Sequence, residues 1–131
     1  MIDPNFAYGG MCNTEVSWTL SYVDETKTKM KLTIRGNGAM PEYGTGAAPW
    51  YQYLNDIVEV EVCEGVTTIG RCAFYGLKFV KTATIADTVT AINDYAFNGC
   101  FSLKSIVIPD SVTYIAETAF TKTGLSEIPT V

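Results

Sequence analysis

The chain has 131 residues, of which 47% are hydrophobic and 18% charged, and this size and composition are typical of one folded domain and exclude a disordered chain. Its net charge of -5 and its nine scattered basic residues argue against a nucleic-acid or anionic-membrane partner, because both are bound through a basic surface. The chain has no histidine, which excludes catalysis by a Ser-His or Cys-His pair, and it has no run of about 18 apolar residues of the kind that inserts into a membrane.

The first part of the chain is expected to contain a leader and a cap. Residues 1–12 lack the basic and apolar regions of a signal peptide, and we expect them to be weakly ordered. Residues 13–56 are expected to form an N-terminal cap. In it, SWTLSY and MKLTIRG alternate apolar and polar residues, which predicts a β-hairpin with VDETKTK as its turn. Such a hairpin would cover the open end of a stacked fold.

A Gly- and Pro-rich segment then leads into the aromatic cluster Trp50, Tyr51 and Tyr53, which could open a short helix after Pro49. Two interpretations stay open. The cluster could pack the cap onto the following residues, which we favour, or it could be a carbohydrate-binding platform. A hydrolytic version of the second interpretation would use carboxylates such as those of Glu42 and Asp56.

The rest of the chain, residues 57–131, is repetitive. The pair Ala-Phe occurs at 73, 96 and 119, so that both intervals are 23 residues (96 - 73 and 119 - 96). Other positions keep the same step: Val66, Val89 and Val112; Ile69, Ile92 and Ile115; Glu64, Asp87 and Asp110. A period between about 20 and 29 residues is typical of leucine-rich-repeat solenoids. We therefore predict a solenoid rich in β-structure with short helical turns.

One short strand is expected in each repeat. In LKSIVI, Leu103, Ile106 and Ile108 have the L-x-x-L-x-L spacing that turns three side chains inward. The equivalent residues are Val80, Ala83 and Ile85 one repeat earlier, and Ile57, Val60 and Val62 two repeats earlier. After Phe120 the pattern continues only if one residue is deleted, so about three repeats are expected and the last is incomplete. The Ala-Phe pairs are predicted to be core rather than a ligand-binding aromatic row.

The residues that face outward from these strands are the candidate contacts for a partner. They are Glu59, Glu61, Lys81, Thr82, Thr84, Lys104, Ser105 and Val107, with Glu127 in the last unit. This surface lacks the aromatic and Arg anchors of strong interfaces, so binding is expected to be weak or to need a longer array. The final strand, near LSEIPTV, has no capping sequence after it, which predicts self-association through that end.

The four cysteines, Cys12, Cys63, Cys72 and Cys100, form no C-x-x-C pair, so neither a metal site nor another cofactor is expected. Their disulfide state stays open, because four cysteines allow three full connectivities. For Cys100, a buried thiol that acts as a small hydrophobe is the favoured interpretation.

The sequence resembles the BspA-like, or Treponema pallidum type, leucine-rich-repeat family. The family's repeat pattern is matched by Cys100, Leu103, Ile106, Ile108, Pro109, Ser111, Val112, Thr113, Ile115, Ala119 and Phe120, and the likeness extends over residues 12–131, with the usual cap. The chain departs from the pattern at Leu77, where the family has Cys, and at Ala86, where it has Pro.

The resemblance implies a non-enzymatic, secreted or cell-surface bacterial protein that adheres to or otherwise contacts an unidentified protein. Two alternatives are a carbohydrate-binding domain that uses Trp50, Tyr51 and Tyr53, and a purely structural cap and spacer of a larger surface protein.

Overall fold

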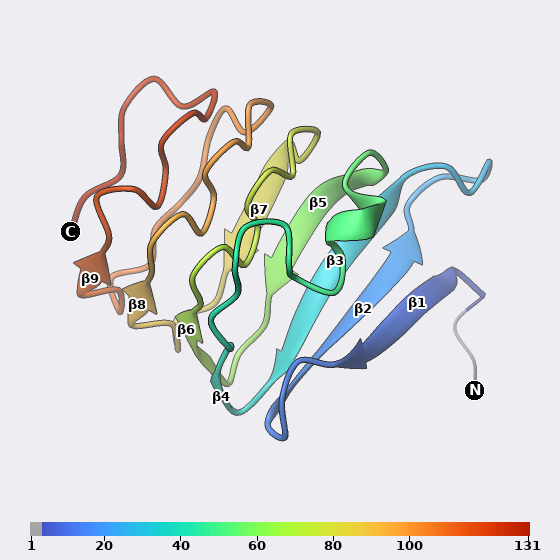
Figure 1. Cartoon of the computed structure of the whole chain (residues 1–131), viewed down its shortest axis with the longest axis horizontal. Helices are drawn as coiled ribbons and strands as arrows, with labels where there is room; N and C mark the ends of the chain where they lie inside the picture. Colours follow the sequence, from blue (N-terminus) through green and yellow to red (C-terminus); the bar gives the residue numbers. More distant parts are fainter. Residues whose placement is uncertain (1–3) are drawn as a thin grey trace.

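The computed structural model describes residues 4–131 and consists mainly of short strands and turns. A five-stranded main sheet has the order β1-β2-β3-β5-β7, and a four-stranded short sheet has the order β4-β6-β8-β9. The strands of the main sheet are Phe6–Met11, Val16–Tyr22, Met30–Gly36, Ile57–Val62 and Thr82–Ile85, and those of the short sheet are Gly38–Ala39, Val66–Ile69, Ala91–Ile92 and Tyr114–Ile115. Figure 1 shows β1 and β9 at opposite ends of the long axis.

The leader is the first difference from the sequence-based expectation. We expected residues 1–12 to be weakly ordered, but Phe6–Met11 form strand β1, which pairs antiparallel with β2. The sequence FAYGGM shows no regular alternation of apolar and polar residues. Most residues of this edge strand are exposed, since it lies against little of the core, so neither face requires a row of apolar side chains. Residues 1–3 of the expected leader lie outside the described part of the chain.

Strands β2 and β3 pair antiparallel, with Val16 opposite Gly36 and Tyr22 opposite Met30. Their alternating apolar residues are buried, as the sequence predicts: Val16, Trp18 and Leu20 on β2, and Met30, Leu32 and Ile34 on β3. In the turn between them, the Asp24 carboxylate accepts hydrogen bonds from the Thr28 and Lys29 N–H groups at 2.9 and 3.0 Å. It also accepts bonds from the hydroxyls of Thr26 and Thr28, so one side chain closes the whole turn.

From β3 onward the strands pair in parallel. In the main sheet β3 pairs with β5 and β5 with β7, where Glu59 lies opposite Thr82. In the short sheet Ala91 lies opposite Tyr114. The two residues of each of these last two pairs are 23 positions apart in the sequence. The V-T-x-I segments supply β6, β8 and β9, a second sheet that we did not predict.

A row of aromatic rings runs through the core. Phe74, Phe97 and Phe120 are fully buried, and their ring centroids are 5.1 and 5.0 Å apart along the row. Trp50 is also fully buried and lies 6.1 Å from Phe74, so it begins the row. The prediction that the Ala-Phe pairs are core is confirmed.

The third predicted strand is absent. Residues 103–108 form no strand, although Leu103 is buried and Ile106 and Ile108 pack against the core as expected. One rung earlier, the Ala86 N–H donates a 3.0 Å hydrogen bond to the Val62 carbonyl. The equivalent residue after 103–108 is proline, which has no N–H and cannot make this bond.

The helical turns expected between strands are mostly plain turns. Among residues 4–131, the one helical element is a 3-10 helix, η1, over Tyr51–Tyr53. It lies where the sequence placed a short helix after Pro49.

Candidate protein-interaction face

The outward side chains of the main sheet form two rows across β3, β5 and β7. Register places Lys31, Glu59 and Thr82 in one row, and Thr33, Glu61 and Thr84 in the next. We call the surface made by β3, β5, β7 and the adjoining residues 104–107 the polar face. Four of the eight predicted contact residues, namely Glu59, Glu61, Thr82 and Thr84, are therefore neighbours on one sheet. Lys81 is exposed at the start of β7.

The remaining predicted contacts lie beyond a gap. Lys104, Ser105 and Val107 are exposed, and Val107 has 82% of its surface accessible. A hollow of about 390 Å³ separates the segment that holds them from β7. The structure thus brings the predicted residues to one side of the molecule, but it does not join them into one continuous sheet.

Strand β3 adds two residues to this face that sequence reasoning missed, Lys31 and Arg35, whereas Thr33 between them is buried. The alternation of MKLTIRG already placed them opposite its buried apolar residues. They were missed because nothing in the sequence shows that the second hairpin strand pairs in parallel with the first repeat strand. Without the pairing of β3 with β5, the sequence does not show that Lys31 lies beside Glu59 and Glu61.

The electrostatics of the polar face centre on Lys31. Its Nζ lies 2.6 Å from Glu61 Oε1 and 3.4 Å from Glu59 Oε2. The hydrogen bond to Glu61 raises the pKa of Lys31, and the same bond lowers the pKa of Glu61. Arg35 donates to the Thr19 hydroxyl at 3.3 Å, which extends the polar network onto β2. The ionised side chains therefore hold one another in place on the sheet.

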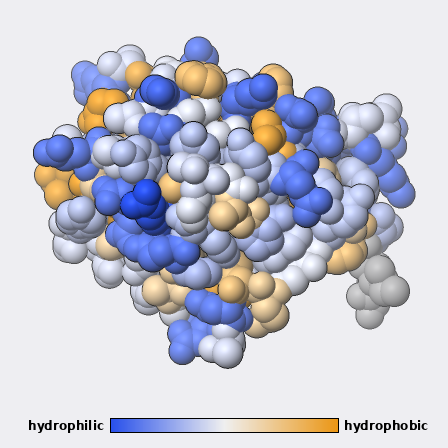
Figure 2. Space-filling view, viewed as in Figure 1, coloured by the Kyte–Doolittle hydropathy of each residue, from blue (hydrophilic) through white to orange (hydrophobic). Residues whose placement is uncertain are grey.

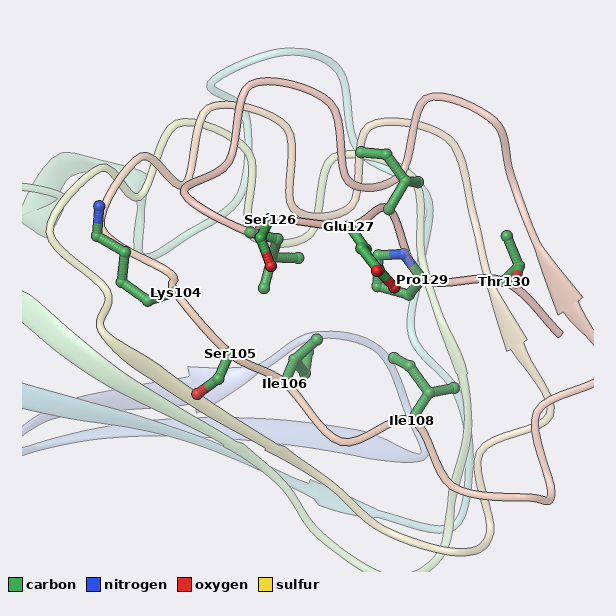
Figure 3. Close-up of a pocket in the computed structure, with 10 residues that line it drawn as sticks. Lys104, Ser105, Ile106, Ile108, Ser126, Glu127, Pro129 and Thr130 are labelled. Atoms are coloured by element: carbon green, nitrogen blue, oxygen red, sulfur yellow. The ribbon is translucent and has the colours of Figure 1, made fainter.

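A second hollow, of about 430 Å³, lies between residues 104–108 and the C-terminal segment 125–130. Figure 3 shows Ile106 and Ile108 turned toward that segment, whereas Ser105 points away from it. On the face shown in Figure 2, hydrophobic residues form small separated patches among hydrophilic ones.

The aromatic cluster packs inside the protein and onto neighbouring rings. The buried Trp50 indole donates a 2.7 Å hydrogen bond from Nε1 to the Ala73 carbonyl. Tyr51 stacks on Tyr75, and Tyr53 stacks on Tyr8 with ring centroids 4.4 Å apart. The favoured packing interpretation is therefore confirmed for Trp50, which has no exposed surface to offer a sugar, while Tyr51 and Tyr53 are half-buried.

Glu42, one of the two carboxylates considered for hydrolysis, is held in structural contacts. Its Oε1 accepts a 2.9 Å hydrogen bond from the Asn93 side-chain amide, and its Oε2 accepts one from the Arg71 N–H. Asp56 is exposed, and its main-chain carbonyl accepts the Met30 N–H at 2.8 Å. The structure therefore gives both residues a part in joining neighbouring segments.

All four cysteines are free. Cys100 is fully buried, as expected, its Sγ donates to the Phe74 carbonyl at 3.2 Å, and burial raises its pKa to about 12. Residues 4–131 contain no group of three or more His, Cys, Asp or Glu side chains that could hold a metal ion. Within the same range, no helix has the length and hydropathy that crossing a membrane requires.

The parallel strands, short turns and shared core define the class of the protein, a leucine-rich-repeat protein. Residues 49–130 match the family described as "BspA type Leucine rich repeat region (6 copies)", and the chain belongs to that family. Proteins of this kind are generally non-catalytic repeat modules.

Solved structures show the same fold. A leucine-rich-repeat protein from Eubacterium ventriosum is 32% identical with a TM-score of 0.78, and the match covers 87% of this chain and 29% of that one. One from Bacteroides capillosus is 19% identical with a TM-score of 0.60, covering 94% and 96% of the two chains. The T. pallidum leucine-rich-repeat protein is 22% identical with a TM-score of 0.53, covering 91% and 55%. No curated protein matches the chain.

Proposed function

We propose that the chain is a protein-interaction module of a secreted or cell-surface bacterial protein, and that it contacts its partner through the polar face. The proposal depends chiefly on the charge of that face. The residues that define it carry three basic side chains (Lys31, Arg35, Lys104) and two acidic ones (Glu59, Glu61), a net charge of +1 on a chain whose net charge is -5. A partner with an acidic patch would be attracted to this face and repelled by the rest of the surface.

The proposal includes an architecture. Residues 57–131 would form a solenoid with a 23-residue period, and the hairpin within residues 13–56 would cap its first rung. Parallel partners 23 positions apart, such as Glu59 and Thr82, support the period. Buried Trp18, Leu20 and Ile34, which continue the core beyond β5, support the cap. Members of this family usually occur on or outside bacterial cells, and this supports the proposed secreted or cell-surface location. We propose adhesion as the role of the chain there.

A pair of charge-matched variants tests the proposal. Thr84 is exposed on β7, in the middle of the polar face, and Thr67 is exposed on β6 of the short sheet. Thr84→Glu places a negative charge against an acidic partner and should reduce capture from host extracellular matrix and epithelial lysate about tenfold or more, whereas Thr67→Glu should not. Equal capture by both variants would contradict the use of this face. Enrichment of no partner at all would favour a purely structural role as a cap and spacer.

A second copy of the chain is the other candidate partner. Ile128 and Val131 are 53% and 71% exposed beside Ile115 at the end of the short sheet, which favours self-association there. Size-exclusion chromatography with light scattering measures this directly, and a strict monomer at high concentration would remove the idea.

A further inference from the structure

We propose that the gap between β7 and residues 105–109 accepts an extended peptide segment of a partner, which adds to the main sheet as its sixth strand. We call this gap the β7 groove. It is lined by Thr82, Ala83, Thr84, Ile85 and Asp87 on one side, and by Ser105, Ile106, Val107 and Pro109 on the other. The proposal rests on the interaction function proposed above and names the kind of partner and its mode of binding.

The first argument concerns the backbone of β7. Strand β7 is the last in the main sheet and pairs with β5 alone. Within residues 4–131, no backbone hydrogen bond joins 82–85 to 105–108. The edge of β7 that faces the groove therefore leaves N–H and C=O groups free of protein partners, and such an edge is a template for an added strand.

The second argument is that the sequence keeps the groove open. Two hydrogen bonds close the ends of the pairing between β5 and β7. At one end the Lys81 N–H donates to the Val58 carbonyl at 2.9 Å, and at the other the Ala86 N–H donates to the Val62 carbonyl at 3.0 Å. One rung later the second donor is replaced by Pro109, which cannot donate. Residues 104–108, the next segment of the chain itself, are thus less able to pair with β7.

The third argument concerns which peptide fits. The groove offers apolar side chains at Ala83, Ile85, Ile106 and Val107, so a strand with alternating apolar residues would bury them. Exposed Lys81 and Lys104 stand at the start of the two walls, while exposed Asp87 and Asp110 stand at the end. The fitting peptide is therefore extended and uncharged in its centre, with an acidic residue toward the lysines and a basic residue toward the aspartates. Four paired residues span about 13 Å.

The test uses the wild-type protein and a synthetic heptapeptide, KVTVTVD, with blocked ends. The peptide would bind antiparallel to β7, so that the C-terminal Asp of the peptide lies near Lys81 and Lys104. Amide chemical-shift changes in a ¹H–¹⁵N spectrum should concentrate at 82–85 and 105–108. The matched control is the same peptide with alternate backbone nitrogens methylated on the edge that pairs, which keeps every side chain and removes the N–H donors. We expect this control to bind about tenfold more weakly or less.

Equal affinity for the two peptides, or shift changes confined to residues outside both walls, would overturn strand addition. Absence of any binding at millimolar peptide would do the same. These results leave the proposed function intact if Thr84→Glu still loses its captured partner. Conversely, backbone-dependent peptide binding would support the groove even if no protein were captured through the polar face.

Discussion

The indole N–H of Trp50 donates a 2.7 Å hydrogen bond to the carbonyl of Ala73, which is 23 residues further along the chain. Both residues are buried, and the indole also lies 6.1 Å from the ring of Phe74. The residue that ends the Gly- and Pro-rich segment thus takes the place of an Ala-Phe pair from a preceding repeat. It supplies both the first ring of the row and a donor to the first repeat.

Trp50→Phe tests the hydrogen bond while it keeps a ring in the core. The buried Ala73 carbonyl would lose its indole donor, at a cost of about 1–3 kcal/mol in the free energy of unfolding. Urea denaturation measures this cost. Tyr51→Phe is the control, since it removes a polar group from the adjacent, half-buried ring. Equal destabilisation by the two substitutions would show that the hydrogen bond to Ala73 contributes nothing.

The aromatic row makes a second prediction. Phe97 lies between Phe74 and Phe120 with no exposed surface, so Phe97→Ala opens a cavity inside the stack and should cost about 3–5 kcal/mol. Phe101, four residues later, is 57% exposed. Phe101→Ala should change the free energy of unfolding by less than about 1 kcal/mol. Comparable losses in the two variants would contradict the assignment of Phe97 to a shared core.

Much of the fold could be predicted because repetition makes each position visible several times. Phe74, Phe97 and Phe120 share one interval, and a side chain found at the same place in three units is best explained by common packing. For Trp50 the sequence favoured packing over a sugar platform but left both interpretations open, because no other tryptophan stands at the equivalent place in a later repeat. Only its burial distinguishes the two interpretations.

The polar face was predictable only within the repeats. Alternation identified Glu59, Glu61, Thr82 and Thr84, because each repeat strand shows its own inward residues. Lys31 could not be included, since its contact with Glu61 depends on pairing between strands that are separated by 20 residues of the chain. The missing strand at 103–108 was likewise hidden. A proline that matches the family pattern does not by itself reveal which hydrogen bond it removes.

That proline provides a third prediction. Pro109→Ala supplies an N–H where Ala86 donates to Val62 one rung earlier, so residues 104–108 should pair with β7 more fully. Hydrogen exchange of the amides in both segments should slow in this variant. Ala86→Pro is the matched reverse change, and by removing an existing 3.0 Å bond it should destabilise the protein by about 1 kcal/mol or more. Unchanged exchange in Pro109→Ala would mean that the proline is not what separates the rungs.

A fourth prediction concerns the turn after each Ala-Phe pair. Gly76, Gly99 and Lys122 follow one another at intervals of 23 residues and have φ angles of 73, 85 and 57°. A side chain is disfavoured at positive φ, so Lys122→Gly should stabilise the protein by about 0.5–1 kcal/mol. Gly99→Ala should do the opposite, because its new Cβ would also lie 3.3 Å from the Gly76 Cα. Thermal melts measure both, and a destabilised Lys122→Gly would contradict the strain at this turn.

The last prediction is a pH dependence that arises at Asp24. Hydrogen bonds from Thr26, Thr28 and the Lys29 N–H favour the ionised carboxylate and lower its pKa well below the value of 3.8 that it has when unfolded. A depressed folded-state pKa gives stability that is present above the unfolded pKa and is lost as the pH falls toward the folded one. Asp24→Asn should therefore melt at a lower temperature than the wild type at pH 7.

The difference in melting temperature between wild type and Asp24→Asn should narrow between about pH 5 and pH 2, because protonation of the wild-type carboxyl removes the same interactions. Asp87→Asn is the control, since it removes one charge from an exposed site far along the sequence. If the difference for Asp24→Asn stayed constant over this range, the hydrogen bonds of the turn would not depend on the charge of Asp24. The closure of the β2–β3 turn would then come from its backbone, with the N–H of Val23 bonded to the Lys29 carbonyl at 2.9 Å.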